Sequence, residues 1–120
     1  SSSSERIGDF VDNTATPGSE TGLVVRGGAT VGQFTQASSV SASTVFKSAF
    51  AVAANDAAKY NNGVRITPSV VMSGTLPTVT TLAFGFNGYT SLSYLNGWIR
   101  KLTYWPARLP DAQLQRLTNP

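Results

Sequence analysis

The sequence predicts an all-β protein, an antiparallel β-sandwich or jelly roll that ends in one short C-terminal helix. Charged residues make up only 12% of the 120 residues, and 11 Gly and 6 Pro interrupt the chain. Short β-branched or aromatic stretches recur about every ten residues between turn signals, a spacing typical of sandwiches. Strands do not alternate with long amphipathic helices, so we do not expect a parallel sheet.

The expected strands are read from alternating apolar residues and the turns between them. Ile7 and Phe10 are core candidates of the first strand, and Gly27-Gly28 predicts a tight hairpin because both of its turn positions favour φ > 0. Asn61-Asn62-Gly63 predicts a second turn. The expected strands are residues 6–12, 21–26, 29–35, 44–53, 64–67, 78–86 and 94–105, with a strand edge within 68–77.

The segment 96–117 has the strongest local pattern. Asn96-Gly97 suits a turn, an aromatic-rich strand follows, and Pro106 ends it because proline has no N–H to donate. A short helix is expected over residues 111–117. Asp111 is its expected cap, and Leu114 and Leu117 are expected on one buried face.

The composition restricts the available chemistry. The chain has no Cys and no His, which excludes disulfides and thiolate metal sites and removes the most common general base. The nine basic residues behind the net charge of +3 are scattered, with Arg100-Lys101 the only adjacent pair, so nucleic-acid binding is not expected. There is no stretch of about 18 apolar residues, so we expect no membrane span.

Four sequence segments in residues 45–106 follow one another in the same order as in one protein superfamily. They are VFKSAFAV at 45–52, the Asn-rich segment 55–63 that ends in Asn-Gly, LAFG at 82–85, and LNGWIRKLTYWP at 95–106 followed by Arg-Leu-Pro and the helix. Together they resemble the concanavalin A-like lectin/glucanase superfamily, and more narrowly the laminin-G-like jelly-roll domains of phage virion proteins and bacterial surface proteins. The last piece is the most specific.

The resemblance implies a single lectin-like β-sandwich domain over residues 6–120, behind a flexible lead-in of residues 1–5. Domains of the family are longer, and their first strands have no counterpart here. Those strands lie upstream of residue 1, are dispensable, or come from another chain. Because the sequence begins with Ser1 rather than Met, we expect a part of a longer virion or extracellular protein.

The superfamily includes enzymes, but we do not expect catalysis. Its glucanases carry their carboxylates as Glu-x-Asp-x-x-Glu on one strand, and this sequence lacks that pattern, although glycoside hydrolysis needs two carboxylates across the scissile bond. A Ser–Lys pair has no motif in its support, and Lys47, Lys59 and Lys101 are expected to keep sheet faces and edges soluble. The acids are Glu5, Asp9, Asp12, Glu20, Asp56 and Asp111.

Sugar binding commonly uses an exposed aromatic ring with polar side chains beside it. The alternative is that such rings cover the rim of the sandwich core. We expect Trp98 and Trp105 to be packing residues. The candidates for carbohydrate binding are Tyr60, Asn87, Tyr89, Tyr94 and Asn96, with Phe86 as a further loop aromatic.

Two oxygen-rich groups are candidates for calcium, which many members of the resembling family bind. One group contains Asp9, Asp12 and Asn13, and the other contains Asp56 among the asparagines of segment 55–63. Calcium prefers several oxygen ligands. Turn chemistry explains the same residues without a metal, and no other cofactor is expected.

The sequence therefore predicts a non-catalytic binding or adhesion module, associated with a phage or virion, that recognises a glycan. The alternative is a structural virion component, such as a decoration, fibre or tail subunit, that acts through protein–protein packing. Its partners would be other virion or surface subunits, including further copies in a homo-oligomer. Low charge and an incomplete sandwich favour this alternative.

Overall fold

The computed structural model describes residues 4–12, 18–37, 40–41, 43–84, 95 and 97–120, the side chain of Asp12 excepted. Within these residues the chain forms seven strands and one helix, so the expected β-rich fold with a short C-terminal helix is confirmed. The elements are β1 (Glu5–Asp12), β2 (Ser19–Arg26), β3 (Ala29–Gln36), β4 (Ser48–Ala53), β5 (Asp56–Asn61), β6 (Val64–Arg65), β7 (Pro68–Val70) and α1 (Asp111–Thr118).

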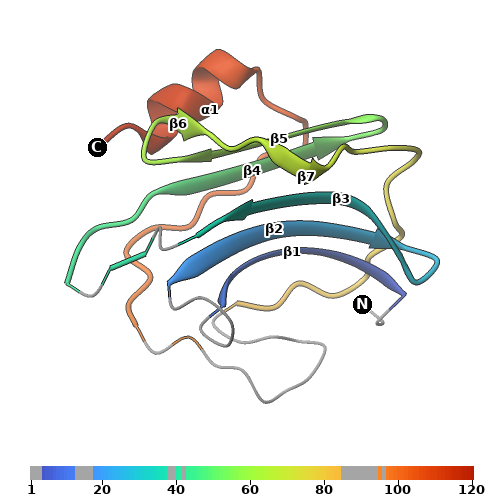
Figure 1. The fold of residues 1–120 in the computed structure, drawn as a ribbon, viewed down its shortest axis with the longest axis horizontal. Coiled ribbons are helices and arrows are strands. Elements are labelled where there is room, and N and C mark those ends of the chain that lie inside the picture. The colour runs from blue at the N-terminus through green and yellow to red at the C-terminus, as the bar shows by residue number, and fades with distance from the viewer. Residues whose placement is uncertain (1–3, 13–17, 38–39, 42, 85–94, 96) are drawn as a thin grey trace.

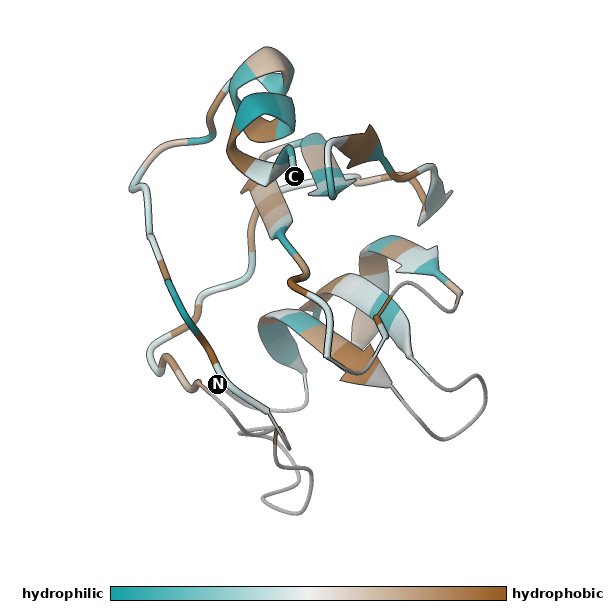
Figure 2. Cartoon of the chain, turned by 90° about the vertical axis from the view of Figure 1, so that its left-hand side faces the viewer, coloured by the Kyte–Doolittle hydropathy of each residue, from teal (hydrophilic) through white to brown (hydrophobic). Residues whose placement is uncertain are grey.

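The strands form two antiparallel sheets that lie over one another (Figure 1). The larger sheet has the order β1-β2-β3-β7, and the smaller has the order β4-β5-β6. Helix α1 covers the outer side of the smaller sheet, as the view turned by 90° also shows (Figure 2). In the described part of the chain the sheets remain open, with β1 and β7 at the edges of the larger sheet and β4 and β6 at the edges of the smaller.

The two tight turns have the expected geometry. Gly27 and Gly28 have φ of 57° and 79° and join β2 to β3. Asn62 and Gly63 have φ of 47° and 80° and join β5 to β6. Positive φ at both turn positions matches the right-handed twist of the flanking strands, so local turn chemistry sets these two hairpins.

The middle of the chain differs from expectation at β4 and β5. β4 begins at Ser48 rather than residue 44, and it pairs along its whole length with β5. The sequence of β5, Asp-Ala-Ala-Lys-Tyr-Asn, contains few residues that favour strands. It is extended because it pairs with β4 on one side and β6 on the other.

Two expected strands are absent from the described parts of their ranges, 78–84 and 97–105. Their alternating side chains are exposed, with Leu82 at 71% and Trp98 at 98%, so the expectation that Trp98 packs is wrong. An apolar pattern becomes a strand only where a neighbour supplies hydrogen bonds and covers one face. Residues 97–110 instead run from the larger sheet's level to α1, apart from both sheets (Figure 2).

The edge strand β1 also exposes a residue that was expected in the core. Ile7 is half-buried, whereas Phe10 is 41% exposed and lies outside the core. β1 is an edge strand of the larger sheet and pairs only with β2 among the described strands. Its side chains therefore have a neighbouring strand on one side only.

Helix α1 forms where expected, but two details of the prediction are wrong. The cap position is Pro110, and Asp111 is the first helical residue, whose carboxylate binds Arg108 instead of capping the helix. Leu114 faces the sheet together with Thr118, one turn later, whereas Leu117 is 46% exposed. The i, i+4 spacing thus defines the buried face.

Candidate functional site

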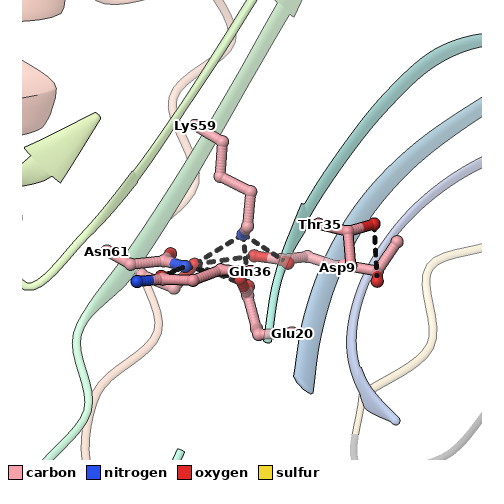
Figure 3. A network of polar contacts seen from close by, with 8 residues as sticks. Asp9, Glu20, Thr35, Gln36, Lys59 and Asn61 are labelled. Atoms are coloured by element: carbon pink, nitrogen blue, oxygen red, sulfur yellow. Dashed lines mark hydrogen bonds and ion pairs between the residues drawn. The ribbon is translucent and has the colours of Figure 1, made fainter. Parts of the chain in front are cut away.

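Six polar and charged side chains meet between the two sheets and form an inter-sheet polar cluster (Figure 3). Three of them, Glu20, Lys59 and Asn61, are almost completely buried, with exposures of 2%, 0% and 2%. Full burial of a lysine and a glutamate is uncommon unless the charges are paired. The cluster consists of Asp9 from β1, Glu20 from β2, Gln36 from β3, Ser48 from β4, and Lys59 and Asn61 from β5.

The Lys59 ammonium is the centre of the cluster. Its Nζ lies 2.6 Å from Oδ1 of Asp9 and forms a second ion pair with Oε1 of Glu20. It also donates a hydrogen bond of 2.9 Å to Oγ of Ser48. The three donors of an ammonium are thereby directed at three partners on three strands.

Asn61 links the cluster to the next strand of the larger sheet. Its Nδ2 donates to Oε2 of Glu20 at 2.7 Å and to Oε1 of Gln36 at 2.8 Å. Gly22 leaves the room that Lys59 needs, because a Cβ at that position would lie 3.0 Å from Cδ of Lys59 and 3.2 Å from the ring of Phe50. The larger sheet therefore approaches β5 closely at this point.

Burial raises the pKa of Glu20 to about 7. A hydrogen bond and charge repulsion from the Asp9 carboxylate add to this rise, and the Lys59 ammonium opposes it. Burial disfavours the charged form of a carboxyl, and a nearby like charge disfavours it further. The cluster therefore changes its charge close to neutral pH.

The cluster holds the two sheets together, and its chemistry fits that role better than proton transfer. Ser48 donates to Oδ2 of Asp9 at 3.0 Å or to Oε1 of Glu20 at 3.1 Å while it accepts from Lys59. A lysine that activates a serine must act as a base. Lys59 instead donates to Ser48 and pairs with two carboxylates. The expectation that Lys59 keeps a sheet face soluble is wrong because the side chain is buried and paired.

A groove with a volume of about 290 Å³ lies between α1 and the segment that leads into it. Its lining residues are Trp105 and Leu109 from the segment that precedes α1, and Gln113, Arg116 and Leu117 from α1. Trp105 is 40% exposed, so its ring is partly available at the groove. We call this the Trp105 groove.

The residues expected to bind sugar are only partly described. Tyr60 is 7% exposed, belongs to the hydrophobic core with Ala58 and Leu114, and donates a hydrogen bond to Oδ2 of Asp111 at 3.4 Å. Its side chain is therefore packed between the smaller sheet and α1. Asn87, Tyr89, Tyr94 and Asn96, like Phe86, lie outside the described residues.

The calcium candidates are placed apart from one another. Asp9 belongs to the inter-sheet polar cluster, and Asp56 binds Arg108, with its Oδ2 at 2.8 Å from Nε. The side chain of Asp12 and the whole of Asn13 lie outside the described residues. In the part of the chain that the structure describes, no three acidic side chains come close enough together to hold a metal ion.

Sequence reasoning missed both the cluster and the groove. The cluster needs partners that are distant in sequence, such as Asp9 and Lys59, and no local motif marks them. One signal was present: Lys59 and Asn61 stand two apart on a strand, so they share one face, as do Ala58 and Tyr60 on the other. The groove was missed because Trp105 was assigned to packing.

Comparisons of the chain with protein-family models, with curated proteins and with solved structures gave no significant match. Among the described residues, α1 is the only helix, and it is too short and too polar to cross a membrane.

Proposed function

We propose that this chain is a non-catalytic binding module of a virion or extracellular protein and that it recognises a glycan at the Trp105 groove. The observation that carries the proposal is the combination of residues at the groove. A partly exposed indole and two leucines offer an apolar surface, and Gln113 and Arg116 offer polar groups beside it. An aromatic body with polar neighbours suits the two kinds of surface that a sugar ring presents.

The finer fold assignment is part of this proposal. We assign the two stacked, open antiparallel sheets to the layers of a concanavalin A-like jelly roll. The antiparallel pairing within each sheet and the stacking of the two sheets support this assignment. Neither the assignment nor the binding proposal requires calcium, so binding should be measured with and without it.

The test is a glycan array followed by calorimetric titration of the best hit with the complete chain. We expect Trp105→Ala to abolish binding, because a stacked aromatic ring dominates sugar contacts of this kind. Trp98→Ala is the matched control, since Trp98 is 98% exposed and does not line the groove. Absence of any glycan hit, or equal losses for both variants, would overturn the proposal.

A second candidate, a structural virion subunit, is favoured by a different observation. Trp98, Ile99, Leu102 and Tyr104 are 98%, 52%, 56% and 78% exposed on one segment. Contiguous exposed apolar side chains of this kind commonly mark protein contacts. Sedimentation analysis would show concentration-dependent assembly that Trp98→Ser combined with Tyr104→Ser reduces. A strictly monomeric chain at high concentration would argue against it.

A further inference from the structure

The distribution of charge along the chain is uneven, and the excess of positive charge lies in the segment that contributes the Trp105 groove. Residues 96–117 contain four cations, Arg100, Lys101, Arg108 and Arg116, and a single acid, Asp111. The segment therefore carries a net charge equal to the +3 of the whole chain, and the remaining residues balance to zero. A surface with an excess of one sign attracts ligands of the opposite sign.

The cations of this segment differ in their pairing. Arg108 is engaged, because its Nε lies 2.8 Å from Asp56 and its NH2 group lies 2.7 Å from Asp111. Arg116 lines the groove, and within the described residues its side chain has no acidic partner. The groove thus contains one guanidinium group and no carboxylate among its lining residues.

We infer that the glycan bound at the Trp105 groove is acidic and that the guanidinium of Arg116 binds the carboxylate of a uronic or sialic acid residue. This inference rests on the proposed glycan-binding function and deepens it. A guanidinium binds a carboxylate through two parallel hydrogen bonds, which gives direction as well as charge. Gln113 then contacts hydroxyls, while Trp105 and the leucines cover the apolar ring face.

The size of the groove limits what it takes. A volume of about 290 Å³ lies at the lower limit of small-molecule sites, which is roughly 300 Å³. It fits one or two sugar residues and leaves the rest of a polymer outside the groove. Arg116 lines the groove, whereas the exposed Arg100 and Lys101 do not, so they can add only a general attraction that salt weakens.

The experiment compares acidic and neutral oligosaccharides of equal length by calorimetric titration of the complete chain. The probes are an oligomer of glucuronic acid, an oligosialic acid and a neutral gluco-oligosaccharide. We expect the acidic probes to bind at least about ten times more tightly than the neutral one. Arg116→Gln should remove that preference, whereas Arg100→Gln, the matched control outside the groove, should preserve most of it.

Three outcomes separate this inference from the function on which it rests. If acidic and neutral probes bind equally and Arg116→Gln changes neither, glycan binding stands and the acidic preference is overturned. If Arg116→Gln and Arg100→Gln weaken the binding of acidic probes equally, and added salt removes the preference for acidic over neutral probes, the preference comes from general charge attraction. The role of Arg116 is then overturned. If no oligosaccharide binds, the proposed function itself fails.

Discussion

The two faces of β5 are both buried, but by opposite kinds of chemistry. One face directs Lys59 and Asn61 toward the larger sheet, where their partners are carboxylates, a hydroxyl and an amide. The other directs Ala58 and Tyr60 toward α1, where Leu114 packs on them. Burial is equally complete on both faces, yet the polar face depends on exact pairing and the apolar face on area and shape.

The largest expected effect comes from removing the central charge of the polar face. Lys59→Met should lower the free energy of unfolding by about 3–5 kcal/mol, because it leaves the carboxylates of Glu20 and Asp9 without their ammonium partner. Denaturant unfolding of the complete chain measures it. Lys101→Met, at an exposed position, is the control and should stay near wild type.

A double-mutant cycle sharpens this result. At a pH well above the pKa of Glu20, adding Glu20→Gln to Lys59→Met should restore part of the lost stability, because it removes the charge that the first change left unpaired. Strictly additive losses, or a Lys59→Met variant as stable as wild type, would show that the two faces of β5 do not differ in the way described.

On the apolar face the corresponding change is smaller. Leu114→Ala should lower the free energy of unfolding by about 2–4 kcal/mol through lost burial and the cavity left behind. Leu117→Ala removes the same atoms from a side chain that is 46% exposed, so it should lose less than half as much. Thermal unfolding of both variants measures the two losses of stability. Equal losses would contradict the assignment of Leu114 to the buried face of the helix.

The pH dependence of stability separates the two faces further. Glu20 has a pKa raised from 4.5 to about 7 by burial, so the folded state binds a proton more tightly than the unfolded state. Its contribution is therefore favourable below the unfolded pKa and is lost as the pH rises toward 7 and beyond. We expect stability to fall by roughly 1–3 kcal/mol between pH 5 and pH 8.

Glu20→Gln is the control for this titration. The amide keeps the shape of the side chain and an acceptor for Asn61, but it has no titrating proton. Unfolding curves of this variant should be nearly independent of pH over the same range. A variant that keeps the full pH dependence of wild type would exclude Glu20 as its cause.

The smallest expected effect belongs to the acid at the start of α1. The hydrogen bond from Arg108 lowers the pKa of Asp111 below its usual range. Its stabilisation is present above the unfolded pKa and is lost as the pH falls through the lower folded value, the opposite sign to Glu20. Since its side chain is 37% exposed, Asp111→Asn should cost at most about 1 kcal/mol in urea unfolding at neutral pH.

The sequence predicted the elements whose cause is local. Gly27-Gly28 and Asn62-Gly63 have a backbone preference of their own, and the strands and helix around them follow from short-range patterns. Where the outcome depends on distant partners, prediction failed. Residues 97–105 are rich in strand-favouring side chains but have no paired neighbour among the described residues. Lys59 is a buried ion because Asp9 and Glu20 reach it from another sheet. For the candidate site, the sequence supplied the residue types but not the groove.

The central position of β5 has a consequence for how the molecule opens. Its last residues are bonded to β4 on one side and to β6 on the other, while both of its faces are covered. Solvent reaches these backbone amides only after both layers have separated, so their hydrogen exchange reports global unfolding. The outer edges β1 and β4 exchange through local fraying, and deuterium therefore enters this protein from the rims inward.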